Sequence, residues 1–214
     1  MPASRSSLVV VGIDVGGKKK GFHAVALKNG RYHERLKSDD VAELVAWCVK
    51  TVGASVVAVD APCRWSITGK SRPAELEMHA QGIRCFFTPI RDVALKHPKD
   101  NFGWMFNGEA LFNELEKVYP LRHTVPKAGA KYSFETYPHA ITWHLRGGNA
   151  AAKEKRAQRG DLLKKHRVTT EELTNIDWVD AALCALTAQM AANGERLEAF
   201  GEPQTGFIIV PAKP

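Results

Sequence analysis

The sequence contains few cysteines and no long apolar run. Its four cysteines, Cys48, Cys63, Cys85 and Cys184, are scattered without a C-x-x-C pair. This pattern is typical of reduced thiols in the cytoplasm and argues against a disulfide framework or a zinc site. The first apolar run soon meets Asp14, so we expect no signal peptide, and no stretch reaches the about 20 apolar residues of a membrane-spanning helix. We therefore expect a soluble cytoplasmic protein with no membrane partner.

The chain also lacks linkers, internal repeats and an excess of acidic charge. Its 214 residues include 30 Lys and Arg against 23 Asp and Glu, for a formal net charge of +7. This length suits one domain spanning residues 1–214. A basic balance favours polyanionic partners such as nucleic acid, although many basic proteins bind none. The sequence leaves the oligomeric state open.

A buried strand with a carboxylate near its end organises the N-terminal part of the chain. The run Leu8–Gly17 (LVVVGIDVGG) is rich in β-branched residues and closes on two glycines, which predicts a strand buried on both faces. Asp14 lies near the end of this strand, where a buried carboxylate needs a hydrogen bond, an ion pair or a cation. Strands are predicted next over residues 22–27 and 32–36, joined by a hairpin at Gly30.

Two phosphate-binding sites known from other protein classes contain glycine patterns similar to that of residues 12–18. Gly12-x-x-x-x-Gly17-Lys18 spells most of a phosphate-binding P-loop, but Lys19 stands where that loop needs a Ser or Thr hydroxyl. The following segment is also strand-like, whereas a P-loop requires a helix. An Asp-x-Gly-Gly turn opens the phosphate site of actin-like and sugar-kinase ATPases as well. Those proteins need two such lobes, and the sequence has no second Asp-x-Gly turn, so an ATP-binding protein is the least favoured alternative.

A second apolar strand ends on a carboxylate in the same way. Residues 54–59 (ASVVAV) lead to Asp60, and the apolar spacing over residues 41–52 predicts a helix between the two strands. A helix between two buried strands implies a parallel pair, whose carboxyl ends lie at one edge of the sheet. Asp14 and Asp60 then lie close enough to repel each other, and a divalent cation relieves such repulsion. Either residue alone can simply cap a turn.

The middle of the chain is less regular. Residues 63–131 are rich in Pro, Gly and aromatic residues and are predicted to form an irregular insertion. Within it we expect helices over residues 73–81 and 107–118 and a short strand over residues 85–88. The insertion is a candidate substrate lid, a partner surface or a block over the substrate groove.

Two later segments carry further polar candidates. A strand predicted over residues 132–137 contains Glu135, which faces either the site or solvent. The helix predicted over residues 153–165 is rich in Lys and Arg, with Arg156 and Arg159 on one side. This helix is either a solvated surface or a contact for the phosphate backbone of nucleic acid.

The last strong pattern is a long helix that follows Asn175. Asp180 lies near the edge of its apolar stripe, and Asp177 lies farther round towards solvent. Small alanines beside Asp180 allow this helix to pack tightly on the sheet and to bring that carboxylate to the strand ends. Acidic residues near a helix start also interact favourably with the helix dipole, which by itself can explain them. Residues 207–210 (FIIV) predict a terminal strand or an apolar tail of unknown placement.

Together these segments resemble the ribonuclease H-like fold in its RuvC-type branch. More closely, they are similar to a bacterial and archaeal family of unknown function whose members are predicted nucleases. The resemblance extends from about residue 8 to residue 192. The motifs that carry it are Gly12-Ile13-Asp14, Val59-Asp60-Ala61-Pro62, Phe106-Asn107-Gly108, Glu135-Thr136-Tyr137-Pro138-His139, Lys155-Arg156 and Asp180-Ala181-Ala182-Leu183.

The resemblance implies an α/β fold with a mixed five-stranded sheet, ordered 3-2-1-4-5 and flanked by helices. It also implies a nuclease that hydrolyses phosphodiester bonds with two Mg²⁺ or Mn²⁺ ions roughly 4 Å apart. Asp14 would bridge both ions, and Asp60 and Asp180 would each bind one. Asp177 or Glu135 would serve as an auxiliary ligand.

Lys18 and Lys19 lie beside this predicted site. They are candidates for contact with the nucleic-acid backbone, although a lysine-rich turn can equally be only solvated. The main alternative to a nuclease is a non-catalytic module that binds nucleic acid or a protein on the same fold. The sequence does not distinguish DNA from RNA.

Overall fold

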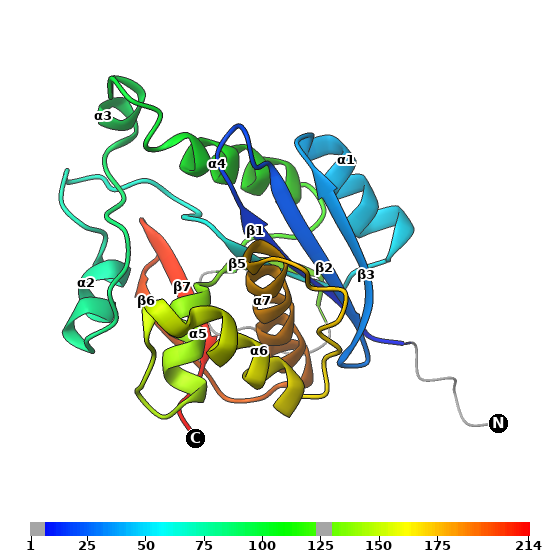
Figure 1. Cartoon of the computed structure of the whole chain (residues 1–214). Helices are drawn as coiled ribbons and strands as arrows, with labels where there is room; N and C mark the ends of the chain where they lie inside the picture. Colours follow the sequence, from blue (N-terminus) through cyan, green and yellow to red (C-terminus); the bar gives the residue numbers. More distant parts are fainter. Residues whose placement is uncertain (1–6, 123–129) are drawn as a thin grey trace.

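A seven-stranded sheet forms the centre of the protein (Figure 1). The computed structural model describes residues 7–122 and 130–214. The strands are β1 (Val9–Val15), β2 (Phe22–Lys28), β3 (Arg31–Ser38), β4 (Val56–Asp60), β5 (Tyr132–Glu135), β6 (Leu197–Glu202) and β7 (Gly206–Pro211). Their order across the sheet is β3-β2-β1-β4-β5-β7-β6. The predicted order of the first five strands is therefore confirmed, and the C-terminal hairpin of β6 and β7 extends the sheet beyond β5.

The strand β1 has one antiparallel and one parallel neighbour. It pairs with β2 through a turn closed by glycines, and with β4 through a crossover that contains a helix. Asp14 is opposite His23 on one side and Asp60 on the other. Because a strand follows Gly17, the strand-then-helix arrangement of a P-loop is excluded.

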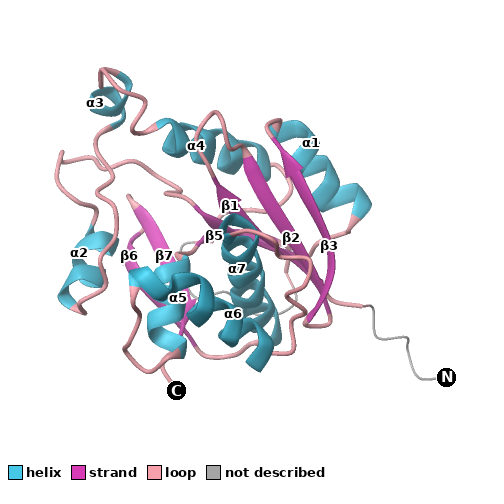
Figure 2. Cartoon of the chain, in the orientation of Figure 1, coloured by secondary structure: helices cyan, strands magenta, loops and turns pink. Residues whose placement is uncertain are grey.

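Helices cover both faces of the sheet (Figure 2). Leu44 and Phe112, from α1 and α4, belong to the core on one face, and Ile141 and Leu163, from α5 and α6, belong to the core on the other with α7. The helices are α1 (Val41–Ala46), the π-helical continuation η1 (Trp47–Thr51), α2 (Pro73–Ala80), α3 (Arg91–Leu95), α4 (Gly103–Leu115), α5 (Pro138–Leu145), the 3-10 turn η2 (Ala152–Glu154), α6 (Lys155–Lys165) and α7 (Ile176–Asn193). None of the helices in the described ranges is both long and apolar enough to cross a membrane.

The helix α7 packs directly on β1 because of Gly12. A Cβ atom at Gly12 would lie 2.0 Å from the backbone nitrogen of Ala185 and 2.1 Å from the carbonyl oxygen of Ala181. Only a glycine on the strand and small residues on the helix permit so close an approach. This contact brings the N-terminal half of α7, and with it Asp180, to the sheet edge where β1 and β4 end.

The segment between β4 and β5 contains α2, α3 and α4. The short strand expected over residues 85–88 is not formed, and this prediction was wrong. Its apolar residues do not pack between strands, since Phe86 is 74% exposed and Phe87 is 43% exposed. The helix expected from residue 107 begins earlier, at Gly103.

Candidate metal centre

Asp14 and Asp60 are neighbours at the carboxyl ends of β1 and β4, as predicted from the two apolar runs. Burial raises the pKa of Asp14 to about 8, and the carboxylates of Asp180 and Asp177 act in the same direction. Burial and the nearby Asp14 carboxylate also raise the pKa of Asp60 well above its usual range. The raised pKa values indicate that several carboxylates share a poorly solvated space with too little compensating positive charge.

The helix α7 supplies Asp177 and Asp180 from its first turns. Asn175 caps the helix by accepting a hydrogen bond from the backbone N–H of Trp178 at 3.0 Å. Asp180 is 7% exposed and forms a buried ion pair with Arg159 of α6. Burial raises the pKa of Asp180 although Arg159 opposes this shift. The structure thus brings Asp14, Asp60, Asp177 and Asp180 to one edge of the sheet.

Among the described residues, a group of side chains that could bind a metal ion contains a histidine that sequence reasoning missed. Asp14, His23 and Asp177 each offer one ligand atom within 4.8 Å of the other two. Ligands at about 2.1 Å from one ion lie up to about 4.2 Å apart, so a small side-chain adjustment would let these three share an ion. The signal was present in the hairpin, since pairing Val15 with Phe22 places residue 23 opposite Asp14.

His23 has the properties of an available nitrogen ligand. It is 3% exposed, and its Nδ1 atom has no hydrogen-bond partner among the described residues. The ring packs edge-on against Trp178, with centroids 4.6 Å apart, and this contact holds it in place. Burial lowers the pKa of His23, which keeps the imidazole neutral near pH 7 with a free lone pair.

Two basic side chains partly neutralise the carboxylates. Lys20 donates from Nζ to both oxygens of Asp177, at 3.0 and 3.3 Å, although its own side chain is largely exposed. Arg159 holds Asp180. Asp14 and Asp60 have no such ion-pair partner within the described parts of the chain.

Glu135 is held in a different network. Arg72 donates to both of its oxygens, at 2.9 and 2.6 Å, and the backbone N–H of Cys63 donates to one of them at 2.8 Å. Arg72 also binds Glu75 at 2.9 Å, and all three charged side chains are buried. Glu135 thus ends β5 beside the carboxylate cluster, but its oxygens are already engaged by a cation and an amide.

The four basic residues predicted to contact phosphates differ in exposure: three are exposed and one is buried. Lys18 and Lys19 are exposed in the turn between β1 and β2. Arg156 is exposed and donates to the carbonyl oxygen of Thr174 at 3.0 Å. Arg159 is buried against Asp180, so the expected surface shared by Arg156 and Arg159 is corrected: the second arginine points inward because a buried carboxylate needs a counter-charge.

The motif Phe106-Asn107-Gly108 links the segment between β4 and β5 to the strand ends. The side-chain amide of Asn107 donates to the carbonyl oxygen of Gly16 at 2.8 Å. A Cβ at Gly108 would lie 2.6 Å from the Cβ of Ala61, which follows Asp60. The helix α4 is therefore fixed against the loops that leave β1 and β4.

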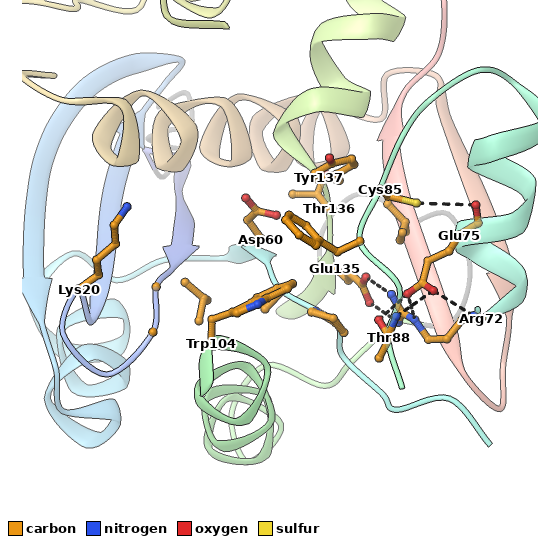
Figure 3. Close-up of a pocket in the computed structure, with 17 residues that line it drawn as sticks. Lys20, Asp60, Arg72, Glu75, Cys85, Thr88, Trp104, Glu135, Thr136 and Tyr137 are labelled. Carbon is orange, nitrogen blue, oxygen red and sulfur yellow. Dashed lines mark hydrogen bonds and ion pairs between the residues drawn. The ribbon is translucent and has the colours of Figure 1, made fainter. Parts of the chain in front are cut away.

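A pocket of about 320 Å³ opens beside the carboxylates (Figure 3). Lys20 lies at one end and the Arg72–Glu135 network at the other, with Asp60 and Trp104 between them. Tyr137 forms another part of the wall. The strands and the insertion thus enclose a partly aromatic space next to the candidate metal centre.

The strand order and the carboxylates at the ends of β1 and β4 define a ribonuclease H-like α/β protein. A family model described as "Protein of unknown function (DUF429)" matches residues 12–205, and the chain belongs to this family. The family predicted from the motifs is thereby confirmed. Among solved structures, Thermus thermophilus RuvC is similar at 17% sequence identity, with a TM-score of 0.45, over 87% of this chain and 97% of that chain. The comparison with curated proteins gives no match.

Proposed function

We propose that this protein is a metal-dependent nuclease that hydrolyses phosphodiester bonds. The observation that carries this proposal is the position of Asp14, which adjoins Asp60 in the sheet and forms a ligand group with His23 and Asp177. This position, with Asp60 on the neighbouring strand and His23 and Asp177 on the other side, would let Asp14 bridge a pair of divalent ions. The substrate is nucleic acid, consistent with the net charge of +7.

The donor atoms fit Mg²⁺ or Mn²⁺. Carboxylate oxygens suit both ions, and the imidazole of buried His23, whose Nδ1 has no hydrogen-bond partner among the described residues, would add a nitrogen ligand. The residues that would hold two ions are Asp14 for both, Asp60 and Asp180 for one, and His23 and Asp177 for the other. When bound, such ions activate water and stabilise charge on the reacting phosphate.

The chain's own side chains would orient the substrate. Lys18 and Lys19 are exposed beside the ends of β1 and β2, where they can bind backbone phosphates. Lys20 donates to Asp177 in the absence of substrate. In this proposal Lys20 would instead bind a substrate phosphate, and the Asp177 carboxylate would then be free to bind an ion. In this proposal Glu135 acts as a positioning residue, since with Arg72 it fixes the end of β5.

A cleavage assay tests this function. Wild type, Asp14→Asn and Asp92→Asn would be incubated with single-stranded, duplex and branched DNA and RNA in Mg²⁺ or Mn²⁺. Asp92 is an exposed carboxylate of α3 and serves as the matched control. We expect cleavage by wild type and Asp92→Asn and none by Asp14→Asn, with all three proteins folded. Cleavage that survives in Asp14→Asn contradicts the proposal.

A second candidate is a non-catalytic module that binds nucleic acid. The observation favouring it is that Arg159 and Lys20 already neutralise Asp180 and Asp177, two of the four carboxylates. On this alternative the protein binds nucleic acid through its lysine turn and shows no turnover with any metal. The same assay, combined with a binding measurement, separates the two functions.

A further inference from the structure

We propose that the pocket beside the carboxylates receives an unpaired nucleobase, so that the preferred substrate has a single-stranded or extruded nucleotide next to the cleaved phosphate. The position of the cleaved phosphate rests on the function proposed above. The base-binding role rests on the aromatic wall, the size and the basic surroundings of the pocket itself.

Two aromatic side chains form the outer wall. Phe86 comes from the irregular segment after α2, and Trp104 comes from the first turn of α4; their ring centroids are 6.0 Å apart at an angle of 63°. Phe86 is 74% exposed, which is unusual for so large an apolar side chain. A ring held at a pocket mouth with most of its surface exposed offers a stacking platform for a base.

The volume of the pocket and the positive charge around it favour one unpaired nucleotide as the ligand. A space of about 320 Å³ is at the lower end of small-ligand sites and cannot admit a base pair with its two backbones. A base must leave its stack to enter. Lys20 lines the pocket, and Lys18 and Lys19 are exposed beside it, which favours a ligand that carries phosphates over an apolar peptide.

Binding without metal tests this inference separately from catalysis. In EDTA, wild type, Phe86→Ala and Phe87→Ala would be titrated into single-stranded oligonucleotides containing 2-aminopurine and into the matching duplexes. Phe87 is the matched control, because it is the adjacent exposed phenylalanine but does not line the pocket. We expect quenching of 2-aminopurine by stacking, tighter binding of the single strand, and affinity about tenfold weaker in Phe86→Ala only.

The outcomes distinguish the two proposals. Specific quenching without cleavage in any metal supports the pocket and overturns the nuclease. Cleavage of fully paired duplex that is unchanged in Phe86→Ala overturns the pocket and leaves the nuclease. Equal affinity for single strand and duplex, no oligonucleotide binding, or equal effects of Phe86→Ala and Phe87→Ala also overturn the pocket.

Discussion

Asp14 and His23 lie directly opposite each other in the β1–β2 pair, and each has a ligand atom within 4.8 Å of the other and of an Asp177 ligand atom. A carboxylate and an imidazole in cross-strand register form a rigid pair, because both backbones are fixed by the sheet. In the proposed metal centre, this pair would add nitrogen to an otherwise all-oxygen ligand set.

The histidine predicts a metal preference. Nitrogen ligands favour transition-metal ions over Mg²⁺, so His23→Ala should lower the affinity for Mn²⁺ more than the affinity for Mg²⁺. Calorimetric titration of each ion gives the ratio. The control is His33→Ala, an exposed histidine of β3, which should leave both affinities unchanged. A ratio that stays constant in His23→Ala would show that the imidazole does not bind the ion.

The pKa of Asp14 predicts how stability depends on pH without metal. Its folded-state pKa of about 8 lies above the usual value of 3.8, so between these pH values the folded protein holds a proton that the unfolded chain has lost. The free energy of unfolding should therefore fall as pH rises through this window, and less steeply in Asp14→Asn. Urea unfolding in EDTA at several pH values measures both slopes. Identical slopes for wild type and Asp14→Asn would contradict the assignment.

The close contact at Gly12 predicts a large loss of stability. Gly12→Ala forces α7 away from β1, because the new Cβ meets helix backbone at 2.0 Å; the cost should reach at least about 3 kcal/mol. Gly160→Ala is the matched control, since nothing lies within 4 Å of a Cβ there and the residue is helical. That variant should gain up to about 1 kcal/mol. Thermal unfolding of the two variants measures both changes in stability and so tests the close contact between α7 and β1.

The two roles suggested for Glu135 make different predictions. As the buried partner of Arg72, its replacement by Gln should cost about 3 kcal/mol of stability and leave the number of bound Mn²⁺ ions unchanged. Glu114→Gln removes an exposed pair with Lys117 and should change stability by less than about 1 kcal/mol. Loss of one bound ion in Glu135→Gln would instead make this residue a metal ligand, as the motif resemblance implies.

The hairpin of β2 and β3 and the pairing of Asp14 with Asp60 could be predicted because each rests on a local pattern, whereas the full order of the first five strands followed from the motif resemblance. An apolar run that ends on an acidic residue, repeated across a helix, fixes both the strands and their parallel relation. The long apolar stripe of α7 likewise predicted Asp180 near the strand ends, and its alanines explain how the helix comes so close.

Long-range ionic partners could not be predicted in this way. Arg72 is 63 residues from Glu135, and Arg159 is 21 residues from Asp180, and no spacing rule connects such pairs. The same limit applies to β7, whose placement beside β5 depends on contacts between distant segments. The aromatic residues of the insertion carry no period, so their position beside the site emerged only from the fold.

The most direct test of the metal centre is calorimetric titration of Mn²⁺ into wild type, Asp14→Asn and Asp92→Asn at a pH above 8. The account predicts about two ions bound by wild type and Asp92→Asn, and loss of both in Asp14→Asn, because in the proposed centre that carboxylate would bind both ions. Undiminished binding by folded Asp14→Asn, or no Mn²⁺ binding by wild type even with an oligonucleotide present, would contradict it.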